Sequence, residues 1–110
     1  MINEKIFLKK NVIYIYGIID FSDITFILCK YNNFTLSSKK FFIVNLRFLQ
    51  SSNTSILLLM INFIKLSIKR DQCIKFIYVP KFLIELSRVY NLNNILYNFY
   101  FRGYHVKRKN

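Results

Sequence analysis

A cluster of hydroxyl and amide side chains carries the most specific chemical signal in this chain. The polar run 50–55 gives way abruptly to the apolar run 56–60. Such a boundary is typical of a helix start, where side-chain oxygens accept hydrogen bonds from the first backbone N–H groups, and we interpret Ser52 or Thr54 as the capping residue. The same hydroxyls could accept a phosphate or bind a partner, and a capping residue can also be exposed. The candidate site residues are Ser52, Asn53, Thr54 and Ser55.

Groups suited to general acid–base or nucleophilic catalysis are scarce. Asp20 and Asp23 stand three residues apart, and that spacing suits the start of a helix better than an acid–base pair. The single histidine, His105, lies beside Lys107 and Arg108 with no serine or cysteine motif to serve. Two glycines cannot build a phosphate-binding loop. The sequence therefore predicts no enzyme activity, no catalytic residue and no cofactor.

The two cysteines, Cys29 and Cys73, lie far apart and form no metal-binding pattern. Each one occupies or borders an apolar run, so we interpret both as small core residues. No metal site is expected.

Strand-like and helix-like segments alternate along the chain. Runs rich in β-branched and aromatic residues predict strands at 11–17, 41–44 and 74–78. Apolar residues at helical spacing predict helices over 22–34, from the 50–55 cluster to 69–70, and from 80 to 90. We assign Leu83, Leu86 and Tyr90 to the inner face of the last helix, and 95–101 to an edge strand. This order indicates one α/β domain with parallel neighbouring strands.

The charge of the chain points to an anionic partner. Seventeen basic residues against five acidic ones give a formal net charge of +12, which suits nucleic acid or an acidic membrane surface. A composition rich in Ile, Lys, Asn, Phe and Tyr is equally typical of A+T-rich codons, which raise lysine everywhere.

The C-terminal tail interleaves basic and aromatic residues. Such residues suit phosphate contact and base stacking, so one hypothesis is a small nucleic-acid-binding protein. A second is that the tail touches anionic lipid, and a third is that it is a solvated terminus. The residues concerned are Tyr100, Phe101, Arg102, Tyr104, His105, Lys107, Arg108 and Lys109.

Several short motifs, in their order and spacing, resemble the STAS domain family. In that family a strand ending in (I/V)DLS leads into a D-(S/T)-x-G loop and a leucine-rich helix. Here the run 42–49, then Asn53-Thr54-Ser55, then the leucines 57–59 stand in that order. The early segment 14–20 looks like the family's L-x-G-E-L-D strand and turn.

The downstream segment 77–92 looks like the family's next strand-to-helix unit. Its ending, Leu86 followed by Val89-Tyr90-Asn91-Leu92, resembles one branch especially, the stand-alone cytoplasmic STAS subunit of the Mla phospholipid transporter. The resemblance covers about Val12 to Leu96.

This resemblance implies a STAS-like domain over 1–96, followed by a basic extension over 97–110. It implies a mixed or mostly parallel sheet of about four to five strands with helices packed against it. It also implies a non-catalytic subunit that binds an ABC-type ATPase and, through that ATPase, a permease complex for phospholipid transport between the inner and outer membranes. Thr54 matches the hydroxyl residue that lies at the ATPase contact in this branch.

Four residues depart from the family pattern. Asn53 and Asn45 stand where the family has acidic residues, Ile56 replaces a glycine, and Ile18 replaces a glutamate. Losing the acid beside Thr54 weakens the case for recognition by a kinase more than it weakens a docking role. The alternative within the family is an anti-sigma-factor antagonist, whose partner switching depends on phosphorylation at the position of Thr54.

The sequence also indicates a location. The residues around the first short apolar piece include Asn3, Glu4, Lys9 and Lys10, a pattern unlike a signal peptide. The longest apolar stretch, 56–68, is interrupted by polar residues and falls short of the ~20 residues that a bilayer span needs. We therefore expect a cytoplasmic protein, and the resemblance implies that it associates peripherally with the inner membrane through the transporter.

Overall fold

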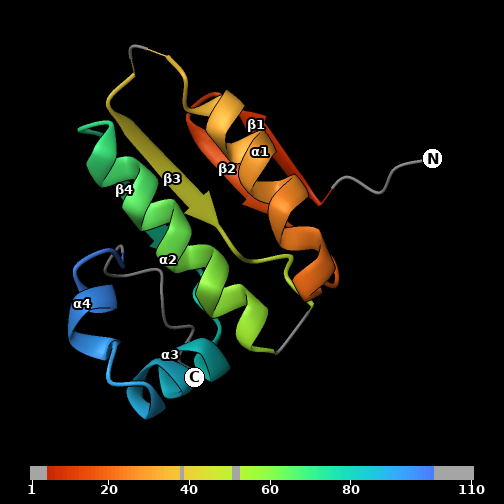
Figure 1. The fold of residues 1–110 in the computed structure, drawn as a ribbon, viewed down its shortest axis with the longest axis vertical. Helices are drawn as coiled ribbons and strands as arrows, with labels where there is room; N and C mark the ends of the chain where they lie inside the picture. Colours follow the sequence, from red (N-terminus) through yellow and green to blue (C-terminus); the bar gives the residue numbers. More distant parts are fainter. Residues whose placement is uncertain (1–4, 38, 51–52, 101–110) are drawn as a thin grey trace.

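The computed structural model describes residues 5–37, 39–50 and 53–100, whose strands and helices alternate after an initial hairpin (Figure 1). The strands are β1 (Ile6–Lys9), β2 (Val12–Ile15), β3 (Phe41–Asn45) and β4 (Cys73–Ile77). The helical elements are the 3-10 turn η1 (Phe21–Asp23), α1 (Ile24–Phe34), α2 (Thr54–Lys69), α3 (Lys81–Val89) and α4 (Asn93–Tyr97).

The four strands form one sheet in the order β1-β2-β3-β4. β1 pairs with β2 in antiparallel fashion, whereas β2–β3 and β3–β4 are parallel and are joined through α1 and α2. The predicted α/β class with a mixed, mostly parallel sheet is confirmed. β1 is an addition to the predicted strands, because its four residues were too few for a period-two pattern to stand out.

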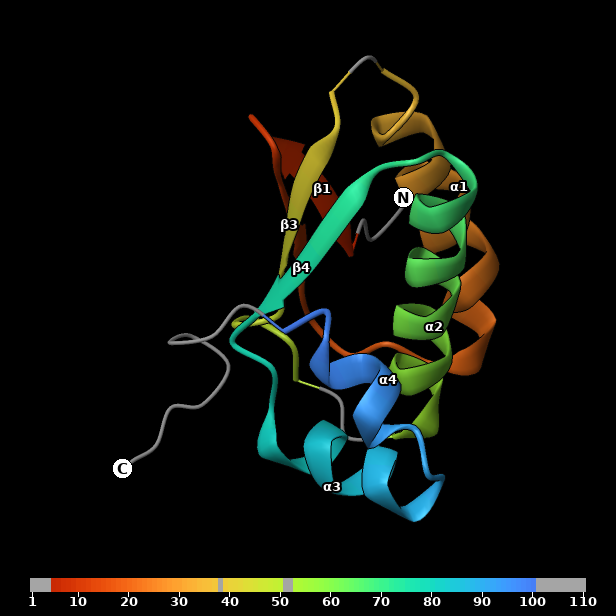
Figure 2. The ribbon, with the colours of Figure 1, turned by 90° about the vertical axis from the view of Figure 1, so that its left-hand side faces the viewer.

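α1 and α2 lie side by side on one face of the sheet and bury its inward side chains (Figure 2). Between the two helices, the rings of Tyr31 and Phe63 stack with centroids 4.1 Å apart and an interplanar angle of 20°. Desolvation in this interface raises the pKa of the Tyr31 hydroxyl far above its usual range. The inward residues of the strands are Ile6, Ile13, Ile15, Phe42, Val44, Ile74 and Phe76.

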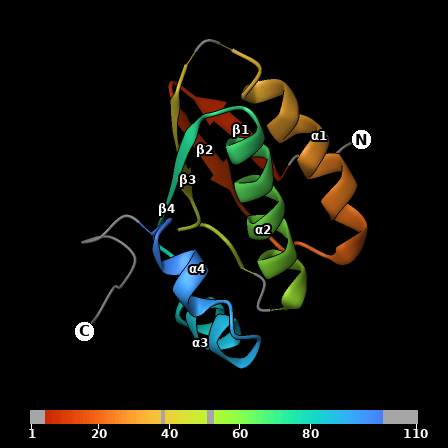
Figure 3. The same cartoon turned by 60° about the vertical axis from the view of Figure 1, so that its left-hand side comes forward.

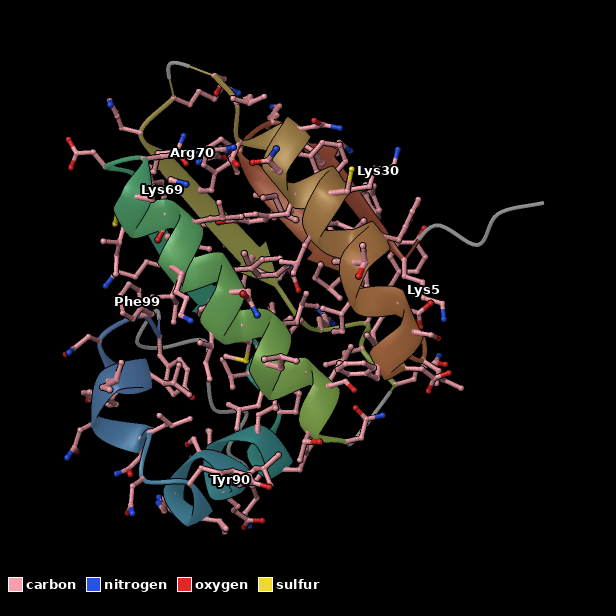
Figure 4. The ribbon with its side chains drawn as sticks, in the orientation of Figure 1. Lys5, Lys30, Lys69, Arg70, Tyr90 and Phe99 are labelled. Carbon is pink, nitrogen blue, oxygen red and sulfur yellow. The ribbon has the colours of Figure 1, made fainter. Side chains whose placement is uncertain are left out.

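Arg70, the C-cap residue of α2, joins the ends of the two helices (Figure 4). Its guanidinium donates to the carbonyl oxygen of Asn32 at 3.0 Å, and also to the Asn32 side chain and to the Thr35 hydroxyl. Thr35 is fully buried, and its hydroxyl in turn donates to the Tyr31 carbonyl at 2.8 Å. The guanidinium therefore adds a donor at the end of α1, where the last carbonyls lack partners within the helix.

α3 and α4 pack together beyond the carboxyl ends of the strands (Figure 3). α4 covers part of the predicted 95–101 strand, because the N–H of Leu96 bonds to the Leu92 carbonyl at 2.9 Å and so starts a helical turn. Among the residues that the structure describes, a single bridge between Phe76 and Tyr100 remains of the expected edge pairing. Tyr100 is buried, so the folded body extends at least to that residue, while 101–110 lie outside the described residues.

Three predicted core residues are exposed. Cys29 faces away from the sheet, since the inward positions of α1 are Ile24, Ile27 and Tyr31. Cys73 precedes the inward-facing Ile74 and therefore points to the other face of the sheet. Tyr90 is 54% exposed at the end of α3, whereas Leu83 is fully buried and Leu86 partly buried, as predicted.

α2 is the longest helix in the described ranges, with sixteen residues. Lys65 and Lys69 are exposed on its outer surface, whereas apolar residues such as Leu59 and Phe63 are buried against the core. No helix within 5–37, 39–50 and 53–100 is both long and apolar enough to cross a membrane.

Candidate partner-binding surface at the carboxyl ends of the strands

The loops that leave β2 and β3 are bonded to each other. The N–H of Gly17 donates to the Phe48 carbonyl at 3.0 Å, and the N–H of Gln50 donates to the Gly17 carbonyl at 2.8 Å. Gly17 has φ 83, a left-handed conformation that glycine adopts without the strain a side chain would bring. Together these bonds hold the loop after β2 against the loop before α2.

Asn53 fixes the start of α2 on this platform. Its Oδ1 accepts from the N–H of Ser55 at 3.0 Å, and its Nδ2 donates to the carbonyl oxygen of Ile19 at 3.1 Å. The capping residue is thus Asn53, and the interpretation of Thr54 as the cap is wrong. An N-cap residue has an extended backbone conformation. Asn53 has this conformation, with φ -120 and ψ 173, whereas Thr54 is already helical.

The structure brings three of the four predicted site residues together. Asn53 and Thr54 are exposed, whereas Ser55 turns inward and is only 9% exposed. The fourth residue, Ser52, lies outside the described residues. Thr54 therefore offers a hydroxyl group to solvent at the first helical position of α2, where backbone N–H groups make the local potential positive.

Large apolar side chains are exposed on the segments that leave β2 and β3 and on the first turns of α2, a feature that the sequence did not predict. Ile18 and Phe21 come from the segment after β2, Phe48 comes from the loop after β3, and Leu58 lies one turn beyond Thr54. Phe21 is 73% exposed and Phe48 54%. We call this set, with Thr54, the Thr54 surface. Apolar residues in the segments just beyond the ends of the predicted strands were the signal that could have revealed it.

Asp20 and Asp23 begin the first helical segment beside this surface, as predicted. An Asp23 side-chain oxygen accepts from the N–H of Asp20 at 2.8 Å and pairs with the Lys5 ammonium at 2.9 Å. These two donors, first the backbone N–H and then Lys5, lower the pKa of the Asp23 carboxyl below its usual value of 3.8. Both aspartate side chains thus accept hydrogen bonds from backbone N–H groups at the start of this helical segment. Figure 4 shows Lys5 at the same end of α1.

Arg47 lies between two aromatic rings near the Thr54 surface. Its guanidinium carbon is 5.2 Å from the centroid of the Tyr78 ring and 6.0 Å from that of Phe48. Its backbone N–H is held by the side chain of Asn45 at 2.9 Å, which fixes the turn after β3. This arrangement leaves a positive charge at the border of the exposed apolar side chains.

The described residues contain no group of three His, Cys, Asp or Glu side chains that could hold a metal ion. The Thr54 surface has the chemical groups of a binding surface. It combines an exposed hydroxyl group, apolar side chains and the nearby Arg47 guanidinium on loops held by backbone hydrogen bonds. No protein-family model matches the chain, and no curated protein matches it either.

Proposed function

We propose that the chain is a non-catalytic STAS-type subunit that docks onto the ABC ATPase of a phospholipid transport system and, through it, onto the permease at the inner membrane. The observation that carries the proposal is the exposure of Thr54 at the start of α2, beyond the carboxyl ends of β3 and β4. In α/β domains this edge of the sheet is the usual place for ligands and partners. The nature of the partner is inferred from the motif resemblance.

The chemistry of the Thr54 surface suits a protein partner. Exposed Phe21, Phe48 and Leu58 supply apolar area, and Arg47 supplies a charge at the rim, as in many protein interfaces. The platform is preorganised by hydrogen bonds, so docking would order few additional groups. Such a contact changes ATP turnover only if the subunit binds one state of the ATPase better than another.

Affinity purification from detergent-solubilised membranes tests the proposal. An ABC ATPase and its permease are expected to co-elute with the tagged chain in a fixed ratio, as identified by mass spectrometry. Thr54→Glu should abolish or strongly weaken this co-elution. Ser37→Glu is the matched control, because Ser37 is an exposed hydroxyl residue before β3, at the opposite end of the sheet. Recovery of the chain without an ATPase, or equal behaviour of both variants, would refute the docking role.

The anti-sigma-factor antagonist remains a second candidate, and the exposed Thr54 hydroxyl is the observation that favours it. A phosphate at the first position of a helix meets the positive end of the helix dipole, so it would change the surface without disturbing α2. Intact-mass measurement of the chain isolated from its native cell distinguishes the two. A mass increase of one phosphate that Thr54→Ala removes would favour the antagonist.

A further inference from the structure

The face of the sheet opposite α1 and α2 carries no described helix (Figure 2). Alternate residues of the strands point to it, and nearly all of them are exposed or half-buried. We call this set the open face. Its residues are Phe7, Lys9, Val12, Tyr14, Phe41, Ile43, Asn45, Cys73, Lys75 and Ile77.

The centre of the open face is apolar and aromatic. Phe7 on β1 and Tyr14 on β2 form a cross-strand pair whose rings stack with centroids 4.7 Å apart and an interplanar angle of 11°. The rings of Phe7 and Tyr16 make an edge-to-face contact with their centroids 5.6 Å apart. Val12 and Ile43 lie in register beside this group. The result is an apolar surface with tyrosine hydroxyls, a combination enriched where proteins meet the membrane interface.

Lysines gather at one edge of the open face. Lys10 and Asn11 in the β1–β2 turn, together with Lys39, Lys40 and Phe41 at the start of β3, line a shallow hollow of about 370 Å³. The ammonium group of Lys39 donates to the Lys10 carbonyl at 3.5 Å, which draws the two segments together. Phe41 is 39% exposed and belongs both to the hollow and to the open face.

Acidic residues are missing from this side of the described structure. None of the four strands contains Asp or Glu. Asp71 lies in the turn before β4, the strand that pairs with β3. The described residues show no ion pair between Asp71 and Lys10, Lys39 or Lys40. The three ammonium groups therefore repel a second copy of this chain and attract a partner that carries phosphate or another anion.

We propose that the open face and its lysine hollow bind the anionic surface of a phospholipid membrane. Lys10, Lys39 and Lys40 contact lipid phosphates, while Phe7, Tyr14 and Phe41 enter the boundary between headgroups and acyl chains. Single-stranded nucleic acid is less well matched, because the Phe7–Tyr14 stack covers one face of each ring and Tyr16 also contacts Phe7, which leaves less free ring face on which bases could stack. The lysine hollow lies at the end of the sheet opposite the Thr54 surface, and the inference goes beyond the proposed function without resting on it.

Vesicle co-sedimentation of the purified full chain tests the inference. Vesicles of equimolar phosphatidylcholine and phosphatidylglycerol are compared with vesicles of phosphatidylcholine alone, at low and high salt. We expect binding to the anionic vesicles only, weakened by salt. The combined variant Lys10→Gln, Lys39→Gln and Lys40→Gln should lose affinity on the order of a hundredfold, given the typical contribution of a basic residue near an anionic surface.

Two matched controls separate a defined surface from net charge alone. Lys65→Gln, Lys69→Gln and Lys81→Gln together remove the same charge from exposed positions on α2 and α3, and should leave most of the binding intact. Phe7→Gln should weaken binding, whereas Ile68→Gln, at an exposed apolar residue of α2, should not. Circular dichroism confirms that each variant is folded.

Three results would overturn the inference. The first is failure of the chain to bind anionic vesicles at low salt. The second is an equal loss of binding in the two triple-lysine variants, which would mean that net charge alone drives the association. The third is tighter binding of a single-stranded oligonucleotide than of the vesicles, with the same dependence on Lys10, Lys39 and Lys40. Because no ATPase is present, none of these results depends on the docking role of Thr54.

Discussion

The side-chain amide of Asn53 at the start of α2 donates to the carbonyl oxygen of Ile19 at 3.1 Å, across a separation of 34 residues in the chain. The same side chain accepts from the N–H of Ser55, so one residue both caps α2 and ties it to the loop after β2. An ionised aspartate at this position could cap the helix but could not donate to Ile19. The asparagine thus adds a tie between the two loops beneath Thr54.

Replacement of Asn53 separates these two roles. Asn53→Ala removes both hydrogen bonds and should lower the free energy of unfolding by about 1–2 kcal/mol. Asn53→Ser keeps a capping oxygen but is too short to reach Ile19, so its loss should be smaller. Urea unfolding followed by circular dichroism measures both. Equal losses in the two variants would mean that capping contributes little here.

Asp23 should make stability depend on acidity. Since its pKa is lowered in the folded state, its ionised form is stabilised by folding, and this contribution is present above the unfolded-state pKa and lost as pH falls through the folded one. Asp23→Asn should therefore be less stable than the parent at about pH 7 and nearly equal to it at about pH 2. Urea midpoints at both pH values check this. Ser22→Ala, at an exposed residue of η1 without a titratable side chain, is the control and should change stability by the same amount at both pH values.

Arg70 should contribute to stability through the geometry of its guanidinium. Arg70→Ala leaves the buried Thr35 hydroxyl and the Asn32 carbonyl without this donor, and should cost about 1–3 kcal/mol. Arg70→Lys should recover only part of the loss, because an ammonium cannot reproduce the planar fork of donors. Thermal unfolding compares these variants with Lys69→Ala, which removes an exposed charge next to it. A loss in Lys69→Ala as large as that in Arg70→Ala would contradict this role.

The Tyr31–Phe63 stack should be a main source of packing energy between α1 and α2. Phe63→Ala removes a fully buried ring and should lower the free energy of unfolding by about 3–5 kcal/mol. Tyr31→Phe keeps the ring and loses only a long hydrogen bond of 3.5 Å to the Phe63 carbonyl, so its effect should stay below about 1 kcal/mol. Chemical denaturation of both variants checks the contrast. A large loss in Tyr31→Phe would assign the energy to the hydroxyl instead.

Truncation should show where the folded body ends. A chain that stops at Leu96 loses the hydrogen bond from the Phe76 N–H to the Phe99 carbonyl at 2.7 Å, as well as the buried Tyr100. We expect it to be less stable by about 2–4 kcal/mol than a chain that stops at Tyr100. Thermal melts of the two truncated chains measure this difference. Identical melting temperatures would show that residues 97–100 add nothing to the body.

Strong local patterns made β3, β4 and α2 predictable from the sequence. A continuous apolar run marks β3, β-branched and aromatic residues mark β4, and the change from polar to apolar residues at 50–56 marks the start of α2. β1 was not predictable, because four residues become a strand only through pairing with β2. α4 was mistaken for a strand, since three consecutive apolar residues at 95–97 fit either structure.

The candidate site was predictable in position but not in detail. Thr54 could be placed at the end of a parallel sheet from the order of the elements alone. The role of Asn53 depends on the Ile19 carbonyl, which only the folded loops bring within reach. The exposure of Phe21 and Phe48 could not be predicted either, because an apolar residue between elements is equally compatible with burial and exposure until the surrounding elements are placed.

The order of the strands in the sheet is the order in which the chain is synthesised. Each new strand therefore adds to the open edge of those already made, and no strand has to enter between two that are already paired. The β1–β2 hairpin can form first, and β3 and β4 can join as α1 and α2 emerge from the ribosome. Assembly in this direction always extends the same edge of the sheet, so no pair that has already formed has to open to admit a later strand.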